Sequence, residues 1–103
     1  ANAPTVKIIG TVVEDDRVHL LLDAKDSEGG NVSKGRSFAV IETVRSEVWG
    51  TVEVTGLQNG KAVAAVTDYT PNPVFWGLLE NRRAFVSSVP PNLIAAPIAQ
   101  EVT

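Results

Sequence analysis

Short segments of alternating apolar and polar residues recur along the first two thirds of the chain, and each segment ends at a turn signal. Residues 6–13 (VKIIGTVV) and 17–22 (RVHLLL) flank an acidic turn, a pattern that predicts a β-hairpin. Gly10 interrupts the first alternation, so we expect a bulge or a close backbone approach there. Asn59-Gly60 is the strongest short hairpin signal that a sequence offers. These features together predict an all-β chain.

Three further strands are predicted before the alternation stops, at residues 36–44, 47–57 and 62–67. In the middle one of these, we expect Val48 to face the core together with Val52 and Val54. This arrangement requires a bend near Gly50. The last of the three is rich in alanine, which indicates close packing against a neighbouring strand.

The pattern changes after Asp68, because two nearby prolines lack the backbone donor that a strand needs. Residues 73–80 predict at most one short helix, with Asn72 as its N-cap. Residues 84–89 predict a last short strand, which ends at a Pro-Pro pair. The remaining residues, 92–103, are small and apolar without a period, and we interpret them as a docked tail or the start of a linker.

Five or six short strands in 103 residues predict one small barrel or sandwich, and we favour a barrel. Residues 10–23 and 50–68 support it, because both read Gly-Thr-Val, strand, turn, strand, Asp. The predicted organisation is a tail or cloning scar at 1–5, a single β-barrel domain at 6–91 and a C-terminal tail or linker at 92–103. Because Met is absent even at position 1, we expect a processed or excised piece.

Composition excludes several kinds of partner and site. Nine Lys and Arg stand against twelve Asp and Glu, for a formal charge of −3, and no basic block offers a surface for nucleic acid. No apolar run approaches the ~20 residues that a membrane-spanning helix needs. The chain has no cysteine, which rules out disulfides, thiolate zinc sites and cysteine nucleophiles.

The sequence offers little for catalysis or metal binding. His19 is the only histidine, and we expect it to be an outward residue of a strand near an acidic turn. No Gly-x-Ser-x-Gly motif marks a serine nucleophile. Asp23, Asp26 and Glu28 lack the spacing of an EF-hand, so we interpret them as a solvated turn and leave a weak surface cation site open. We predict no enzyme, no catalytic residue, no metal and no cofactor.

The residues that we assign to an interaction are large aromatics and a neighbouring arginine pair. They are Trp49, Tyr69, Phe75, Trp76, Arg82 and Arg83. Aromatic and arginine side chains are typical anchors of protein interfaces. Two interpretations stay open for the aromatic rings: they close one open end of the barrel, or they form a protein interface.

The order of turns and apolar residues over about residues 8–67 resembles an SH3-like β-barrel module of bacterial envelope and appendage proteins. The C-terminal domain of flagellar assembly protein T is one such module. The positions that carry the resemblance are Val32, Gly35, Phe38, Val40, Gly50, Val52, Val54 and Ala64. Family members close with a Gly-Asp dipeptide before a last strand, whereas this chain has GLLE at 77–80. The resemblance implies a barrel used for assembly or anchoring within a larger protein.

We therefore expect a non-catalytic structural or protein-interaction module, excised from or assembling into a larger bacterial envelope or appendage complex. Its partner would be a protein, either another copy or a larger assembly, and an oligomer is allowed. The alternative is a ligand- or carbohydrate-binding barrel, with Trp49, Tyr69 and Trp76 as a stacking platform. A hydrolase that uses His19 is the last option. The compartment stays open, with the cell envelope or the extracellular space favoured.

Overall fold

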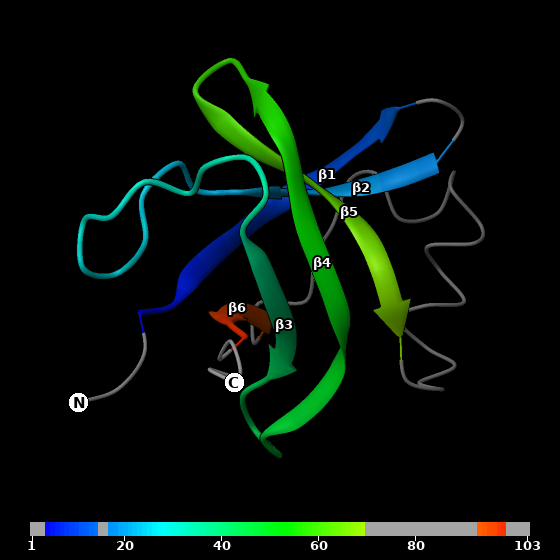
Figure 1. The fold of residues 1–103 in the computed structure, drawn as a ribbon. Coiled ribbons are helices and arrows are strands. Elements are labelled where there is room, and N and C mark those ends of the chain that lie inside the picture. Colours follow the sequence, from blue (N-terminus) through cyan, green and yellow to red (C-terminus); the bar gives the residue numbers. More distant parts are fainter. Residues whose placement is uncertain (1–3, 15–16, 70–92, 99–103) are drawn as a thin grey trace, which may run out of the picture.

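A computed structural model describes residues 4–14, 17–69 and 93–98, which form a closed barrel of antiparallel strands (Figure 1). The strands are β1 (Val6–Glu14), β2 (Arg17–Leu22), β3 (Ser37–Glu42), β4 (Glu47–Gln58), β5 (Lys61–Tyr69) and β6 (Leu93–Pro97). Around the barrel their order is β1-β2-β5-β4-β3-β6, and β6 pairs with β1 to close it. The described residues contain no helix. The prediction of an all-β barrel with five to six strands is confirmed.

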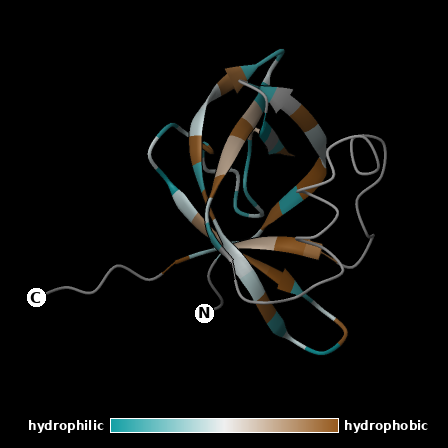
Figure 2. Ribbon diagram, turned by 90° about the vertical axis from the view of Figure 1, so that its right-hand side faces the viewer, coloured by the Kyte–Doolittle hydropathy of each residue, from teal (hydrophilic) through white to brown (hydrophobic). Residues whose placement is uncertain are grey.

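The first hairpin shows the predicted irregularity at its glycine. Apolar and polar residues alternate along the strands (Figure 2), but the register between β1 and β2 shifts between Ile8 and Gly10. Because of this bulge, Ile8 and Thr11 are both buried although they are three positions apart. The bulge expected at Gly10 is therefore confirmed.

Strands β3, β4 and β5 follow one another as a meander. Asn59 and Gly60 both have positive φ, 51° and 76°, as the two central residues of a type I′ turn require. The hairpin predicted at Asn-Gly is thus confirmed. Leu21 of β2 pairs with Val63 of β5, so the two hairpins with similar sequences lie side by side in the barrel.

The start of β4 differs from the prediction, because Val48 does not face the core. Val40 pairs with Gly50 and Ile41 pairs with Val48, which leaves Trp49 as an extra residue in a bulge. The extra residue shifts the alternation by one position. Val48 is consequently 49% exposed and Trp49 only 8% exposed.

The last described strand lies in the segment that we predicted to be a tail or a linker. Residues Leu93–Pro97 form β6, between β3 and β1, and they complete the barrel. The prediction erred because small apolar residues without a period give no local strand signal. The helix predicted at 73–80 and the strand predicted at 84–89 lie outside the described residues.

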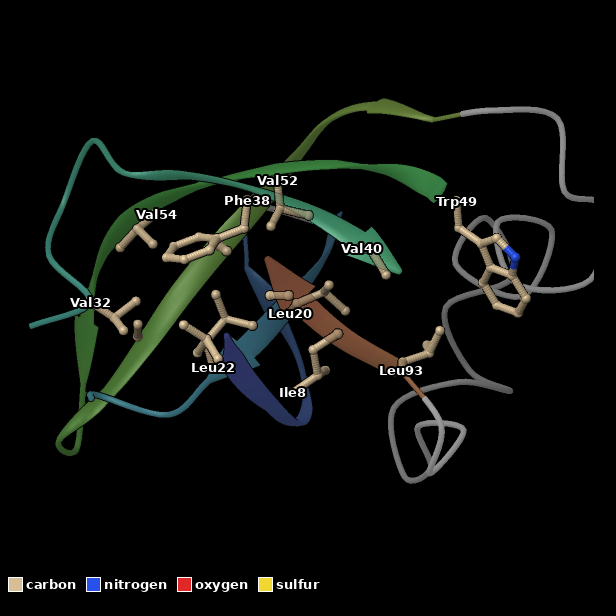
Figure 3. Packing of buried hydrophobic residues seen from close by; sticks show 14 residues of the cluster. Ile8, Leu20, Leu22, Val32, Phe38, Val40, Trp49, Val52, Val54 and Leu93 are labelled. Carbon is tan, nitrogen blue, oxygen red and sulfur yellow. The ribbon is translucent and has the colours of Figure 1, made fainter. Parts of the chain in front are cut away.

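The core lies inside the barrel and receives residues from every strand (Figure 3). Its buried members are Val6, Ile8, Leu20, Leu22, Val32, Phe38, Val40, Trp49, Val52, Val54, Ala62, Ala64, Leu93 and Ala95. Phe38 and Leu20 lie in the middle of the cluster, Val32 lies toward one end and Trp49 toward the other. The cluster extends through the barrel from one open end to the other, and it leaves the outward side chains to interact with solvent or with a partner.

Candidate functional site

The outward residues of β3 and β6 carry no charge. Along β3 and β6 the buried residues alternate with half-buried ones, and the half-buried residues point away from the core. Ala39 pairs with Ala96, and Ile41 pairs with Ile94. We call these four residues the β3–β6 face. They form an apolar outer surface over two neighbouring strands.

Exposed aliphatic side chains border this face at both of its ends. Val44 (78% exposed) and Val48 (49%) lie at the end of the barrel formed by the β3–β4 turn, and Val48 pairs with Ile41. Ile98 (42%) lies at the opposite end, where its N–H donates to the carbonyl of Ser37 at 3.3 Å. The other exposed large aliphatic residues among the described ones are Ile9 on β1 (38%) and Leu57 on β4 (66%). Scattered exposed aliphatics are ordinary, but a gathered set indicates an interaction surface.

A buried carboxylate holds the β3–β4 turn in place. Glu42 is 2% exposed, and its two oxygens accept hydrogen bonds from the N–H groups of Val44 (2.8 Å) and Arg45 (3.0 Å). The Arg45 guanidinium lies 3.6 Å from the same carboxylate. Ser46 completes the turn with a φ of 56°. The turn therefore presents Val44 to solvent in a fixed conformation.

A second carboxylate organises the loop that leads into β3. Asp26 Oδ1 accepts hydrogen bonds from the N–H groups of Gly30 and Glu28, both at 2.9 Å. Its Oδ2 pairs with Arg36 at 3.2 Å, and the Arg36 guanidinium lies 5.0 Å from the centre of the Phe38 ring. The Gly30 N–H, then the Glu28 N–H, and then Arg36 hold the pKa of the Asp26 carboxyl below its usual range. Both ends of β3 are thus fixed by a carboxylate.

A groove of about 720 Å³ adjoins the β3–β6 face along the first half of β1. Its lining includes Ile9 and Ile94 as apolar residues and Lys7, Asp23 and Lys25 as charged ones. The lining residues include no aromatic side chain. The groove therefore extends the apolar surface toward a margin that carries both signs of charge.

The structure brings two of the predicted interaction residues to the same end of the barrel. Trp49 belongs to the core cluster, and its Nε1–H donates to Glu47 Oε2 at 3.3 Å. Tyr69 ends β5 and pairs with Gly50, the residue after Trp49. The other four, Phe75, Trp76, Arg82 and Arg83, lie outside the described residues. Of the two interpretations left open, the burial of Trp49 matches a ring that closes the barrel end.

Asp26 of the acidic turn and His19 both bond to groups of the barrel itself. Asp26 is committed to two N–H groups and Arg36, so its oxygens already have partners. Within the described parts of the chain, no group of three or more His, Asp or Glu side chains could hold a metal ion. His19 lies on the outer side of β2, where its Nδ1 is 3.2 Å from the carbonyl of Arg17.

Sequence reasoning missed Ile41 and Ile94, the central pair of the β3–β6 face. A signal for the first was present, because residues 38–41 (FAVI) are apolar on both faces of a strand. Such a run is typical of a strand whose two faces are both shielded from water. Nothing local indicated Ile94, since its place beside Ile41 depends on pairing between distant segments.

In the described residues there is no helix long and apolar enough to cross a membrane. No protein-family model, no curated protein and no solved structure matches this chain. The structure shares with the SH3-like modules the broad architecture of a small β-barrel, which here has six antiparallel strands.

Proposed function

We propose that this protein is a non-catalytic interaction module that binds a protein partner through the β3–β6 face. One observation carries the proposal: Ile41 and Ile94 pair on the outside of the barrel, and exposed aliphatic residues border them. An antiparallel sheet that stays in water normally places polar residues on its outer side. An apolar outer side loses contact with water when a partner covers it, which favours association.

The border of the face has the character of an interface rim. Arg45 is 72% exposed beside Val44, and Lys7 pairs with Ile94 across β1 and β6. Interfaces combine an apolar centre with a polar margin. The resemblance noted in the sequence favours a larger assembly of the bacterial envelope or an appendage as the setting, with a second copy or another subunit as the partner.

The arrangement around His19 supports a non-catalytic role. Its one hydrogen bond to a described residue is to the Arg17 carbonyl, and no described acid or nucleophile shares a hydrogen bond with it. A general base needs a partner that orients it and a substrate within hydrogen-bond reach. A hydrolase would require a second group beside His19.

The described residues give no specific support to the alternative function, a carbohydrate-binding barrel. A stacking platform needs an exposed aromatic ring, and Trp49 is 8% exposed. The groove along β1 has polar groups, but its lining contains no aromatic residue on which a sugar ring could stack. We therefore retain the protein-binding role.

A photo-crosslinking experiment tests the proposal. Benzoylphenylalanine replaces Val48 in one variant and Leu57 in another, and both are irradiated in cells that produce the protein. Val48 and Leu57 are both exposed, at 49% and 66%, but only Val48 borders the face. We expect discrete protein adducts from position 48, absent from position 57, and lost when Ile94→Lys is added.

Adducts of equal yield from both positions, or none from position 48, would contradict the proposal. Circular dichroism of the Ile94→Lys variant must match the wild type, because Ile94 is half-buried and its loss could otherwise disturb β6. A second variant, Val48→Lys, changes a more exposed residue and should suppress adducts from benzoylphenylalanine placed at position 44.

A further inference from the structure

We propose that Asn59, in the turn between β4 and β5, is a site of spontaneous covalent modification in the folded protein. The reacting groups are the side-chain amide of Asn59 and the backbone nitrogen of Gly60, and water is the co-reactant. The product is a mixture of aspartyl and isoaspartyl residues at position 59. The proposal does not depend on the β3–β6 face or on its partner.

The turn exposes both reacting residues to water at the tip of the β4–β5 hairpin (Figure 1). Gln58 pairs with Lys61, so Asn59 and Gly60 are the two residues between the strands. Their φ angles of 51° and 76° fit a type I′ turn. In such a turn the closing hydrogen bond joins the flanking residues, not the central ones. Accordingly, the Gly60 N–H donates no hydrogen bond to any described residue.

Gly60 also leaves the space around its nitrogen open. A side chain on the residue after an asparagine crowds the approach of the amide to the backbone nitrogen, and a β-branched side chain crowds it most. Gly60 has no side chain, and a Cβ built at this position would meet no atom within 4 Å. The Asn59 amide can therefore turn toward the Gly60 nitrogen without displacing a neighbouring element.

Asn31, the other asparagine in the described part of the chain, lacks these conditions. Its Oδ1 accepts a hydrogen bond from Lys25 Nζ. The nitrogen that would attack it belongs to Val32, which is 1% exposed and donates its N–H to the carbonyl of Ala24 at 2.9 Å. Val32 is also β-branched. Asn31 thus provides an internal control of the same residue type in the same molecule.

The reaction has two steps. The Gly60 nitrogen loses its proton to hydroxide and attacks Cγ of Asn59. The new N–Cγ bond forms as the Cγ–Nδ2 bond breaks, and the amide nitrogen takes a proton from water and leaves as ammonia. Water then opens the cyclic imide at Cγ, which gives aspartate, or at the backbone carbonyl carbon of residue 59, which gives isoaspartate. Nothing is oxidised or reduced, so the exposed turn and water are sufficient.

The two products should affect the barrel differently. Aspartate fits the turn, because Asp-Gly is favoured in type I′ turns as Asn-Gly is. Isoaspartate adds one carbon to the main chain of the turn. Because a two-residue turn fixes the register of its hairpin, the added carbon weakens the adjacent pairs, Gln58↔Lys61 and Leu57↔Ala62. Ala62 is fully buried in the core, so we expect the isoaspartyl form to unfold at a lower urea concentration.

Peptide mapping tests the proposal, because trypsin releases Asn59 in peptide 46–61 and Asn31 in peptide 26–34. The folded protein is incubated in neutral and in mildly alkaline buffer and digested at intervals. We expect aspartyl and isoaspartyl forms of peptide 46–61 to accumulate, faster in the alkaline buffer because the attacking nitrogen must lose its proton. The Val32 nitrogen is free only after local opening, so peptide 26–34 should change at least about tenfold more slowly.

A chemical probe and two variants provide controls. Hydroxylamine cleaves cyclic imides, so it should cut the folded wild-type chain between residues 59 and 60. It should leave Asn59→Gln intact at this bond, because a glutamine amide would have to form a larger ring. Freshly prepared Asn59→Asp is the reference for the aspartyl form and should match the wild type in urea denaturation. The isoaspartyl fraction of the aged protein should be less stable than both.

Two outcomes would overturn the proposal. In the first, peptide 46–61 changes in protein unfolded by urea but not in folded protein, which would mean that the turn protects Asn59. In the second, peptides 46–61 and 26–34 change at equal rates in folded protein, which would mean that modification follows unfolding of the whole chain. Neither outcome affects the proposed binding role, because Asn59 lies two residues from Leu57, the control position outside the β3–β6 face.

Discussion

Two sides of the same barrel treat their outward positions differently. On β4 and β5 the outward side carries Glu53 and hydroxyl groups, and Thr51 Oγ1 lies 2.9 Å from Thr67 Oγ1 in a cross-strand hydrogen bond. On β3 and β6 the outward positions hold Ile41 and Ile94 instead. The inward residues of both sides belong to one core, so packing in the fold accounts for them. In the proposed function, the side formed by β4 and β5 faces water and the side formed by β3 and β6 binds the partner.

The ends of the two sides are also built differently. The β4–β5 hairpin turns through Asn59 and Gly60 with backbone conformation alone. The two ends of β3 are held by the side chains of Glu42 and Asp26, each of which captures two backbone N–H groups. For the proposed binding surface, fixed ends would reduce the conformational entropy that is lost on binding.

The largest expected effect on stability comes from truncating a residue of the core that both sides share. Phe38 is fully buried in the centre of the core, and Phe38→Ala should cost about 3–5 kcal/mol of unfolding free energy. This is a large part of the 5–15 kcal/mol typical of a small domain. Urea denaturation measures it. The matched control is Ile41→Ala, because Ile41 lies three positions along the same strand and points outward. This change should cost about 1 kcal/mol of unfolding free energy or less. Equal losses for the two variants would contradict the distinction between inner and outer positions.

An intermediate effect is expected at the β3–β4 turn. Glu42→Ala removes two hydrogen bonds from a buried carboxylate and should cost about 1.5–3 kcal/mol, since bonds to a charged group are the stronger kind. Arg45 is 72% exposed, so Arg45→Ala should change stability by no more than about 0.5 kcal/mol. Thermal unfolding of both variants provides the measurement. A loss as large for Arg45→Ala would mean that the ion pair, and not the backbone bonds, holds the turn.

The smallest effect is expected at the opposite end of β3 and depends on pH. Because the pKa of Asp26 is lowered in the folded state, its ionised form stabilises the fold above about pH 4. That stabilisation is lost as the pH falls through the folded-state pKa. Asp26→Asn should therefore lower the melting temperature at pH 7 and approach the wild type toward about pH 3. A gap of the same size at both pH values would refute the ionic role.

Much of the fold could be predicted because its signals are local. The bounds of β2 and the turn at Asn59-Gly60 follow from alternation and turn chemistry within a few residues. Val48 was misplaced because a bulge at Trp49 shifts the alternation, and the bulge forms only when β3 and β4 pair. β6 was missed because its pairing partners are distant in the sequence and its own residues are small.

The candidate site was less predictable than the fold. The interaction was assigned to large aromatics, yet Trp49 is in the core and the exposed side chains gathered on one side are aliphatic. Only the ring order of the strands reveals that Ile41 and Ile94 are neighbours. The alternation within residues 37–42 shows an apolar outer side, but it cannot show which strand continues that side.

The position of β6 also has a consequence for the order in which the protein is made. A chain leaves the ribosome from its N-terminus, so β1 to β5 emerge before Leu93. Until then Val6 and Val40 have no β6 beside them, and the nascent barrel is open along one seam. Pairing between β1 and β6 joins the most distant segments of the fold, so it has the largest loop-closure cost of the strand pairings. Until Leu93 to Pro97 emerge, the inward residues of β1 and β3 are therefore exposed along the seam that β6 later closes.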